Sequence, residues 1–314
     1  GIIEVDDKWD LGTPMAQIYG LDDPIIEIGL TPNRADCAGV YGIARDLAAV
    51  GLGRLKTLDA PDVAGTFKSK IDVKLEDAGC PHFVGREIRG IKNGPSPAWL
   101  QHYLKAIGLR PISALVDITN FMTMAYARPL HVYDADKIRG DIIVRAAQGG
   151  ETLEALNDKS YTLNAGDLTI NDAEHVVGLA GIVGGMSTGS EEGSVNVFLE
   201  AAYFAPERTA RTGRDLSVSS DARYRFDRGV DPAFTRPAME IFTQMVLDLC
   251  GTDDTQVSEI VEAGAPISWV RTISYDPAYF VQLIGFDVAA SQQKTILDSL
   301  GFIVDNSNIP WNIT

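Results

Sequence analysis

His131 is one of four histidines in the chain and lies in the apolar stretch ARPLHVYD, residues 127–134. An imidazole in such a stretch can act as a general base, ligate a metal ion, or pack in the core with one hydrogen bond. Asp134 is the one local residue that could join it as a metal ligand, so no metal site is expected. Core packing is the default for the local sequence, and a catalytic role requires partners elsewhere.

Glu200 is the first such partner. The stretch NVFLEAAYF alternates, so that Val197 and Leu199 face one side of a strand while Phe198 and Glu200 face the other. A buried carboxylate without a partner is costly, so Glu200 must meet a hydrogen-bond donor or a cation. A ligand satisfies this requirement, and so does an ion pair with a nearby arginine.

Thr119 and Asn120 end the segment ALVDITN, which we interpret as an apolar strand. Their hydroxyl and amide groups can orient a substrate or a water molecule, or cap a turn. Ser220 has no G-x-S-x-G context, so the sequence gives little support for a serine hydrolase.

The stretch GLAGIVGG is the remaining candidate for ligand contact, because glycines let a ligand approach the backbone closely. It lacks the strand-to-helix context of a dinucleotide-binding motif, so nucleotide binding is not expected there. The glycines are Gly178, Gly181, Gly184 and Gly185.

The elements that must position these residues form a mixed pattern between residues 69 and 250. SPAWLQHYLKAIG is typical of a helix with Ser96 as N-cap, and a long helix is expected from Asp231 to Cys250. Many short strand-like segments separated by turns predict an α+β domain built on antiparallel sheets. These segments are IDVKL, HFVGREI, ALVDITN, DIIVRAA, SYTL, DLTIND, VVGLAGIVGG and NVFLEAAYF.

The flanking segments differ in texture. Residues 40–50 predict a helix with Asp36 as N-cap, and residues 52–68 read as a linker. The tail alternates strand, helix, helix and strand, and its last strand runs to the final residue. We therefore expect this chain to be a piece of a longer polypeptide.

Composition restricts the classes of function. The net charge of −16 argues against nonspecific nucleic-acid binding, DNA included, although six arginines stand against five acidic residues between Ala205 and Pro232 and could bind RNA locally. Three cysteines do not predict a disulfide framework. No apolar run is long enough to span a membrane and the N-terminus lacks a secretion signal, so we expect a cytoplasmic protein.

Several long motifs, in this order, resemble the beta subunit of bacterial phenylalanyl-tRNA synthetase. They are LTPNRADCAGVYGIARDLAA, VDITNFMTMAYARPLHVYDADKIRG, GLAGIVGG, VFLEAAYFAPERTARTGRDL and SSDARYRFDRGVDP. The resemblance implies a partial N-terminal α+β domain, B1-like, with its linker (1–58), a central B3/B4-like editing domain with a mixed, largely antiparallel sheet (67–250), and a truncated B5-like domain (268–314). It also implies an alpha-subunit partner in an alpha2beta2 assembly.

The resemblance further implies that the central domain hydrolyses tyrosine from mischarged tRNA(Phe). Glu200 matches the position that reads the tyrosine hydroxyl, Gly181 and Gly184 match backbone positions that line the pocket, and Ala222 matches a pocket wall. His131, Thr119 and Asn120 match positions near the ester. Editing needs no cofactor, whereas the synthetic reaction uses ATP and Mg²⁺ bound outside this chain.

Four exchanges from the family pattern are mild. Ser220 stands where the family has threonine. Phe121 replaces a tyrosine of the family pattern, Tyr133 replaces a phenylalanine, and Asp227 replaces a glutamate. Two other functions stay open: a tRNA-docking module that uses Arg211 and Arg214, and an esterase that depends on Ser220.

Overall fold

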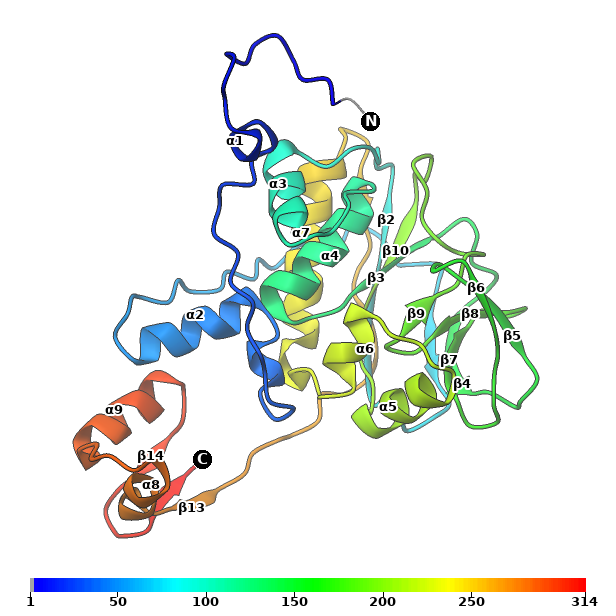
Figure 1. Ribbon diagram of the computed structural model, residues 1–314. Coiled ribbons are helices and arrows are strands. Elements are labelled where there is room, and N and C mark those ends of the chain that lie inside the picture. Colours follow the sequence, from blue (N-terminus) through cyan, green and yellow to red (C-terminus); the bar gives the residue numbers. More distant parts are fainter. Residues whose placement is uncertain (1–2) are drawn as a thin grey trace.

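A five-stranded antiparallel sheet forms the centre of the fold in the computed structural model, which describes residues 3–314. Its order is β11 (Gln256–Val257), β2 (His82–Arg89), β10 (Val197–Tyr203) and β3 (His131–Asp134), and β12 (Val261–Gly264) also pairs with β2. The long strand β10 lies between β2 and β3, so its side chains define both faces of the sheet (Figure 1).

A second sheet packs against one face of the first. Its order is β1 (Val73–Leu75), β4 (Ile142–Ala146), β7 (Leu168–Asn171), β8 (Val176–Leu179) and β9 (Val183–Gly184), and only the β1–β4 pair is parallel. A hairpin of β5 (Thr152–Ala155) and β6 (Lys159–Thr162) lies beside it. The expected α+β class with largely antiparallel sheets is confirmed.

Helices cover the other face of the central sheet: α3 (Ala98–Ala106), α4 (Ala114–Tyr126) and α7 (Thr235–Cys250). The alternation of β10 explains this layering, because Val197 and Leu199 join the core beneath these helices while Phe198 joins the core between the two sheets. The short helices α5 (Pro206–Asp215) and α6 (Asp221–Phe226) and the 3₁₀ turn η2 (Pro232–Phe234) connect β10 to α7.

Two smaller parts flank this three-layered unit. Before it come α1 (Met15–Tyr19), the 3₁₀ turn η1 (Ala35–Cys37) and α2 (Val40–Ala49). After it come β13 (Ile273–Tyr275), α8 (Pro277–Ile284), α9 (Ala290–Ser299), β14 (Val304–Asp305) and β15 (Trp311–Ile313). Helix α9 lies against α2, and both stand apart from the sheets in Figure 1. Among residues 3–314, no helix has the length and apolar character that crossing a membrane requires.

Three local predictions were wrong. The segment ALVDITN belongs to α4, because Leu115, Ile118 and Met122 recur at helical spacing and all three are buried. Asp36 lies in η1 and pairs with arginines, so Gly39 precedes α2 instead. The Ser96 hydroxyl donates to Asp117, and α3 starts one residue later than expected.

A buried ion pair joins the helical layer to the central sheet. Arg86 on β2 donates from Nη1 to Oε2 of Glu240 on α7 at 2.7 Å, and the two side chains are 1% and 8% exposed. The guanidinium also donates to the backbone carbonyls of Val63 and Ser258. Four segments of the chain therefore meet at this charge pair: β2, α7, and the segments around Val63 and Ser258.

The substitution Glu240→Gln leaves the Arg86 guanidinium buried without a counter-charge. We expect it to lower the free energy of unfolding by about 3–5 kcal/mol, as measured by urea denaturation followed by circular dichroism. The matched control is Glu191→Gln, which breaks an exposed pair with Lys137 and should cost about 0–1 kcal/mol. Equal losses in the two variants would contradict this role for the buried pair.

Candidate functional site

A cavity of about 120 Å³ opens between the two sheets and brings together most of the residues that the sequence singled out. Its lining includes His131 and Glu200 from the central sheet, and the predicted pocket residues Gly181, Gly184 and Ala222. An apolar cavity of about 150 Å³ holds benzene, so this space suits roughly one aromatic ring. Residues far apart in the sequence thus meet around one ring-sized space.

Glu200 is 6% exposed and accepts a hydrogen bond at Oε2 from the Tyr133 hydroxyl. No arginine forms an ion pair with it among the described residues. Burial raises the pKa of Glu200 to about 7, although the hydrogen bond from Tyr133 lowers it. The carboxyl group therefore changes its protonation near neutral pH, with a phenol as its polar partner in the fold.

His131 lies directly opposite Glu200 in the antiparallel pairing of β3 with β10. Its ring contacts the Tyr133 ring edge-on, with centroids 4.3 Å apart, and its buried Nε2 has no hydrogen-bond partner within residues 3–314. Burial lowers the pKa of His131 to about 4, so the imidazole is neutral at pH 7. A neutral ring with an unpartnered nitrogen can hold a ligand or a water molecule.

Two glycines make room for the rings around the cavity. A Cβ at position 184 would lie 2.4 Å from Cε1 of His131, so the imidazole packs directly on the Gly184 backbone. Gly181 has a φ of +70°, and a Cβ there would lie about 3.0 Å from the Phe226 ring. Both positions therefore need glycine, one for a close approach and the other also for its backbone conformation.

Ser220 does not line the cavity but fixes the segment that does. Its hydroxyl donates to the carbonyl of Ile182 at 2.7 Å and accepts from the amide of Arg223 at 3.0 Å, where it caps α6. These two bonds tie α6, which carries Ala222, to the turn between Gly181 and Gly184. The expected substrate contact of Ser220 stays a prediction, and the bonds account for the hydroxyl without a nucleophilic role.

Thr119 and Asn120 lie in the middle of α4 and are not among the residues that line the cavity. The Thr119 hydroxyl donates to the Val116 carbonyl one turn earlier. The segment that was expected to present them from a strand is helical. Their place near the ester is not tested by this arrangement and stays a prediction.

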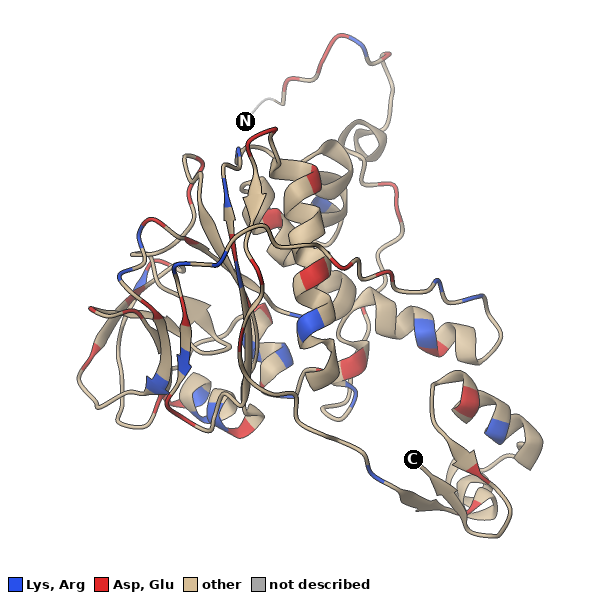
Figure 2. Ribbon diagram, turned by 180° about the vertical axis from the view of Figure 1, so that it is seen from behind, with Lys and Arg blue, Asp and Glu red and all other residues tan. Residues whose placement is uncertain are grey.

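Most of the arginines between Ala205 and Pro232 bind the protein itself. Arg208 pairs with Asp77, and Arg223, Arg225 and Arg228 donate to backbone carbonyls. Arg211 and Arg214 are exposed on α5. Figure 2 shows acidic residues interspersed with basic ones along the ribbon. Arg211 also donates to the carbonyl of Gly166 at 3.2 Å, so most of the local excess of arginines is engaged within the protein.

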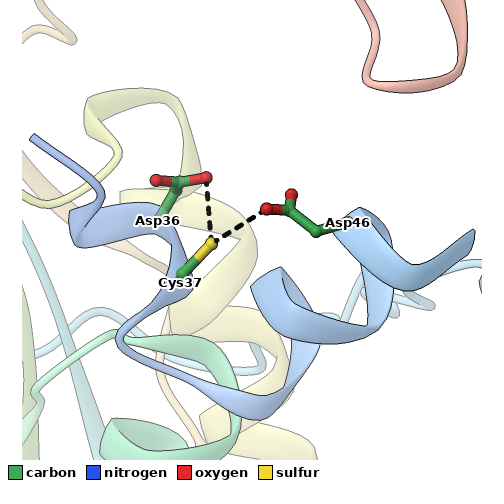
Figure 3. Close-up of side chains that lie close together, drawn as sticks. All are labelled: Asp36, Cys37 and Asp46. Atoms are coloured by element: carbon green, nitrogen blue, oxygen red, sulfur yellow. Dashed lines mark hydrogen bonds between the residues drawn. The ribbon is translucent and has the colours of Figure 1, made fainter. Parts of the chain in front are cut away.

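Asp36, Cys37 and Asp46 place two carboxylates and one thiol, all groups that can ligate a metal ion, within 4.8 Å of one another (Figure 3). Both carboxylates are already paired: Arg34 contacts Asp36 at 3.0 Å and Asp46 at 2.5 Å, and Arg45 also contacts Asp36. Burial raises the pKa of the Cys37 thiol to about 11, so the thiolate that a metal needs is disfavoured. We assign the cluster to ion pairing between η1 and α2.

Tyr133 was missed as a site residue by the sequence reasoning. The available signal was its position two residues after His131, because the two side chains share one face of a strand. The segment ARPLHVYD was not assigned to a strand, so this relation went unused. Phe204 and Phe226 also line the cavity and were not expected there.

Comparison with known proteins gives consistent matches. Residues 79–251, more than half of the chain, match the family model described as the B3/4 domain. The phenylalanine–tRNA ligase beta subunit of Paramagnetospirillum magneticum is 53% identical over 309 residues, which is 97% of this chain and 38% of that protein. The beta subunit of Cereibacter sphaeroides is 50% identical with the same two coverages. The chain thus spans less than half the length of these relatives.

Among solved structures, an N-terminal fragment of the phenylalanyl-tRNA synthetase beta subunit from Pyrococcus horikoshii matches 96% of this chain and 88% of that one. Its sequence identity is 15% and its TM-score is 0.42, a level of similarity from which nothing about this fold follows.

The substitution Gly184→Ala should displace the His131 ring, because the new methyl group would overlap it. We expect a loss of about 1–3 kcal/mol in unfolding free energy and a changed chemical shift of the His131 ring protons by NMR. Gly193→Ala is the control, since a Cβ there meets nothing within 4 Å. An unshifted His131 signal in the Gly184 variant would refute the contact.

The raised pKa of Glu200 predicts a stability that depends on pH. Glu200 stabilises the fold fully below its ordinary pKa of 4.5, and this contribution is lost as pH rises through about 7. Relative to Glu200→Gln, the parent should lose on the order of 3 kcal/mol of unfolding free energy across this window. The lowered pKa of His131 acts in the opposite sense but is common to both proteins. A constant difference from pH 4.5 to 7.5 would refute the shift.

Proposed function

Since the chain belongs to the B3/4 domain family and matches phenylalanine–tRNA ligase beta subunits over 97% of its length, we propose that it carries the editing site of such a ligase. The proposed reaction is hydrolysis of the ester that joins tyrosine to tRNA(Phe). The whole ligase would attach phenylalanine to tRNA(Phe) with ATP and Mg²⁺, at a site outside this chain and together with an alpha subunit.

The chemistry requires a second site. A pocket shaped for phenylalanine can reject tyrosine only by crowding its hydroxyl, which limits discrimination to about 10²-fold. A separate pocket that hydrogen-bonds the hydroxyl reverses the preference, because phenylalanine would leave buried polar groups unpaired. The product of the two steps gives the fidelity that neither pocket reaches alone.

One observation carries the proposal: Glu200 and His131, paired across adjacent strands, line a single ring-sized cavity. Glu200 supplies an acceptor for the tyrosine hydroxyl. The apolar remainder, including Phe204 and Phe226, surrounds the ring. Such a mostly apolar pocket with few polar groups is the usual form of a small-molecule site.

His131 supports the hydrolytic step by position. With a pKa of about 4 it is a weak base, so we assign it to holding the attacking water or the ester rather than to removing the proton. The water oxygen attacks the aminoacyl carbonyl, the bond to the ribose oxygen breaks, and the released ribose oxygen takes up the proton that the water loses and becomes a hydroxyl. Tyrosine and free tRNA(Phe) are the products, and no covalent enzyme intermediate forms.

A tRNA-docking module is the second candidate, supported by exposed Arg211 and Arg214 on α5. It predicts that Arg211→Glu with Arg214→Glu weakens tRNA binding while His131→Ala has no effect on hydrolysis. The Ser220-dependent esterase has the least support, since both hydrogen-bonding functions of that hydroxyl are occupied.

Deacylation of Tyr-tRNA(Phe) by the complete ligase tests the proposal. We expect Glu200→Gln to lower kcat/KM for this substrate by about 10–100-fold and His131→Ala to lower kcat by about 10²-fold. Glu191→Gln removes an exposed carboxylate and serves as the control. Normal clearance of Tyr-tRNA(Phe) by both site variants, folded as the parent is, would disprove the editing assignment.

A further inference from the structure

We propose that Tyr133 is a positioning and specificity-determining residue, whose hydroxyl fixes the Glu200 carboxylate so that it accepts a second hydroxyl from a phenol-bearing substrate. This inference rests on the function proposed above and adds a residue to it. It predicts that selectivity for a tyrosyl over a phenylalanyl ester depends on a tyrosine of the protein itself.

The geometry makes Tyr133 a rigid donor. Its side chain is 1% exposed, and the His131 ring lies edge-on against it. In the strand pairing, Tyr133 stands opposite Phe198 and His131 stands opposite Glu200. The Tyr133 phenol therefore reaches diagonally across the strands to Oε2 of Glu200, and the packed ring leaves it little freedom to turn away.

The other oxygen of Glu200 is available to a ligand. Oε1 accepts no hydrogen bond within residues 3–314, and Glu200 lines the cavity. An ionised carboxylate has acceptor positions on both oxygens, so one donor from the protein does not exclude a second from the substrate. With Oε2 bound to Tyr133, rotation of the carboxyl group is restricted and Oε1 faces the ligand in a defined direction.

The hydrogen bond also favours the charged form of the carboxylate. Burial favours the protonated form of Glu200, and the Tyr133 hydroxyl opposes it. The other titratable groups near Glu200 are His131 on β3 and Cys80 before β2, whose thiol pKa burial and the Glu200 charge raise. The lining from β7, β8 and α6 consists of apolar residues and glycine, such as Ile170, Gly178 and Phe226. Tyr133 is thus the protein group that favours the anionic form of Glu200, and a phenol binds an anion more tightly than a neutral acid.

The test compares the complete ligase with its Tyr133→Phe variant. The measured quantity is the ratio of kcat/KM for Tyr-tRNA(Phe) to that for Phe-tRNA(Phe), from pH 5.5 to 9. We expect the ratio at pH 7 to fall about tenfold and its acid limb to move to higher pH, because Glu200 loses the donor that lowers its pKa. Near pH 9 the part of the loss that comes from protonation of Glu200 should recover, since Glu200 ionises there in both proteins, whereas the part that comes from the lost positioning of the carboxylate should persist.

Tyr203→Phe is the matched control, because this tyrosine is 3% exposed in the same core and does not line the cavity. It should leave the ratio and its pH dependence unchanged. In a Glu200→Gln background, Tyr133→Phe should cause no further pH shift; a further shift there would overturn the proposal in favour of a general packing effect.

The remaining outcomes separate this inference from the proposed function. If Glu200→Gln abolishes selectivity but Tyr133→Phe keeps the ratio and the acid limb of the parent, Tyr133 only packs and the inference is wrong. If Glu200→Gln also keeps the ratio, Glu200 does not read the substrate hydroxyl and this inference is wrong as well. If Glu200→Gln and His131→Ala both clear Tyr-tRNA(Phe) as the parent does, the editing assignment itself fails. Should Tyr133→Phe not fold, 3-fluorotyrosine at position 133 supplies a stronger donor and must move the acid limb to lower pH; an unmoved limb refutes the proposal.

Discussion

The buried carboxylate of Glu200 requires a hydrogen-bond donor in the space between the two sheets, because a charged group removed from water must be hydrogen-bonded or neutralised. The layer around it is built from Phe198, Phe204, Phe226 and Ile170, which offer no donor. Tyr133 supplies one hydrogen bond, and burial still raises the pKa of Glu200 to about 7. The site is therefore incompletely satisfied within the described residues, and a ligand hydroxyl is the kind of group that completes it.

The fold holds this site by fixing its two walls separately. The wall with Glu200 and His131 is the central sheet, which the Arg86–Glu240 pair joins to the helical layer. The opposite wall is the turn around Gly181 and Gly184, which Ser220 ties to α6. Arg86, Glu240 and Ser220 do not line the cavity, although Ile182, whose carbonyl accepts the Ser220 hydrogen bond, does. The side chains that line the cavity are therefore left available for ligand contact.

The sequence predicted those features that depend on neighbouring residues alone, and it did not predict those that depend on contacts between distant residues. The period of two in NVFLEAAYF correctly assigned Phe198 and Glu200 to the same face, because alternation is a property of the strand alone. ALVDITN failed because a short apolar run fits a strand or a buried helix equally, and the later residues Met122 and Thr123 decide for the helix. The sequence could not show how many of the arginines between Ala205 and Pro232 bind the protein itself, because partners such as Asp77 for Arg208 lie far away in the chain.

Burial shifts the pKa values of Glu200 and His131, which are paired across adjacent strands, in opposite directions. Burial raises the pKa of the acid to about 7 and lowers that of the base to about 4, so the imidazole is neutral at pH 7 and Glu200 is close to the midpoint of its titration. An ion pair between them would have satisfied both groups internally and left neither for a substrate. Because the two pKa values are pushed past each other, no proton passes from Glu200 to His131, and each keeps a lone pair for an outside donor. Burial of Glu200 and His131 lowers the stability of the fold, and the same burial keeps both side chains available to a ligand.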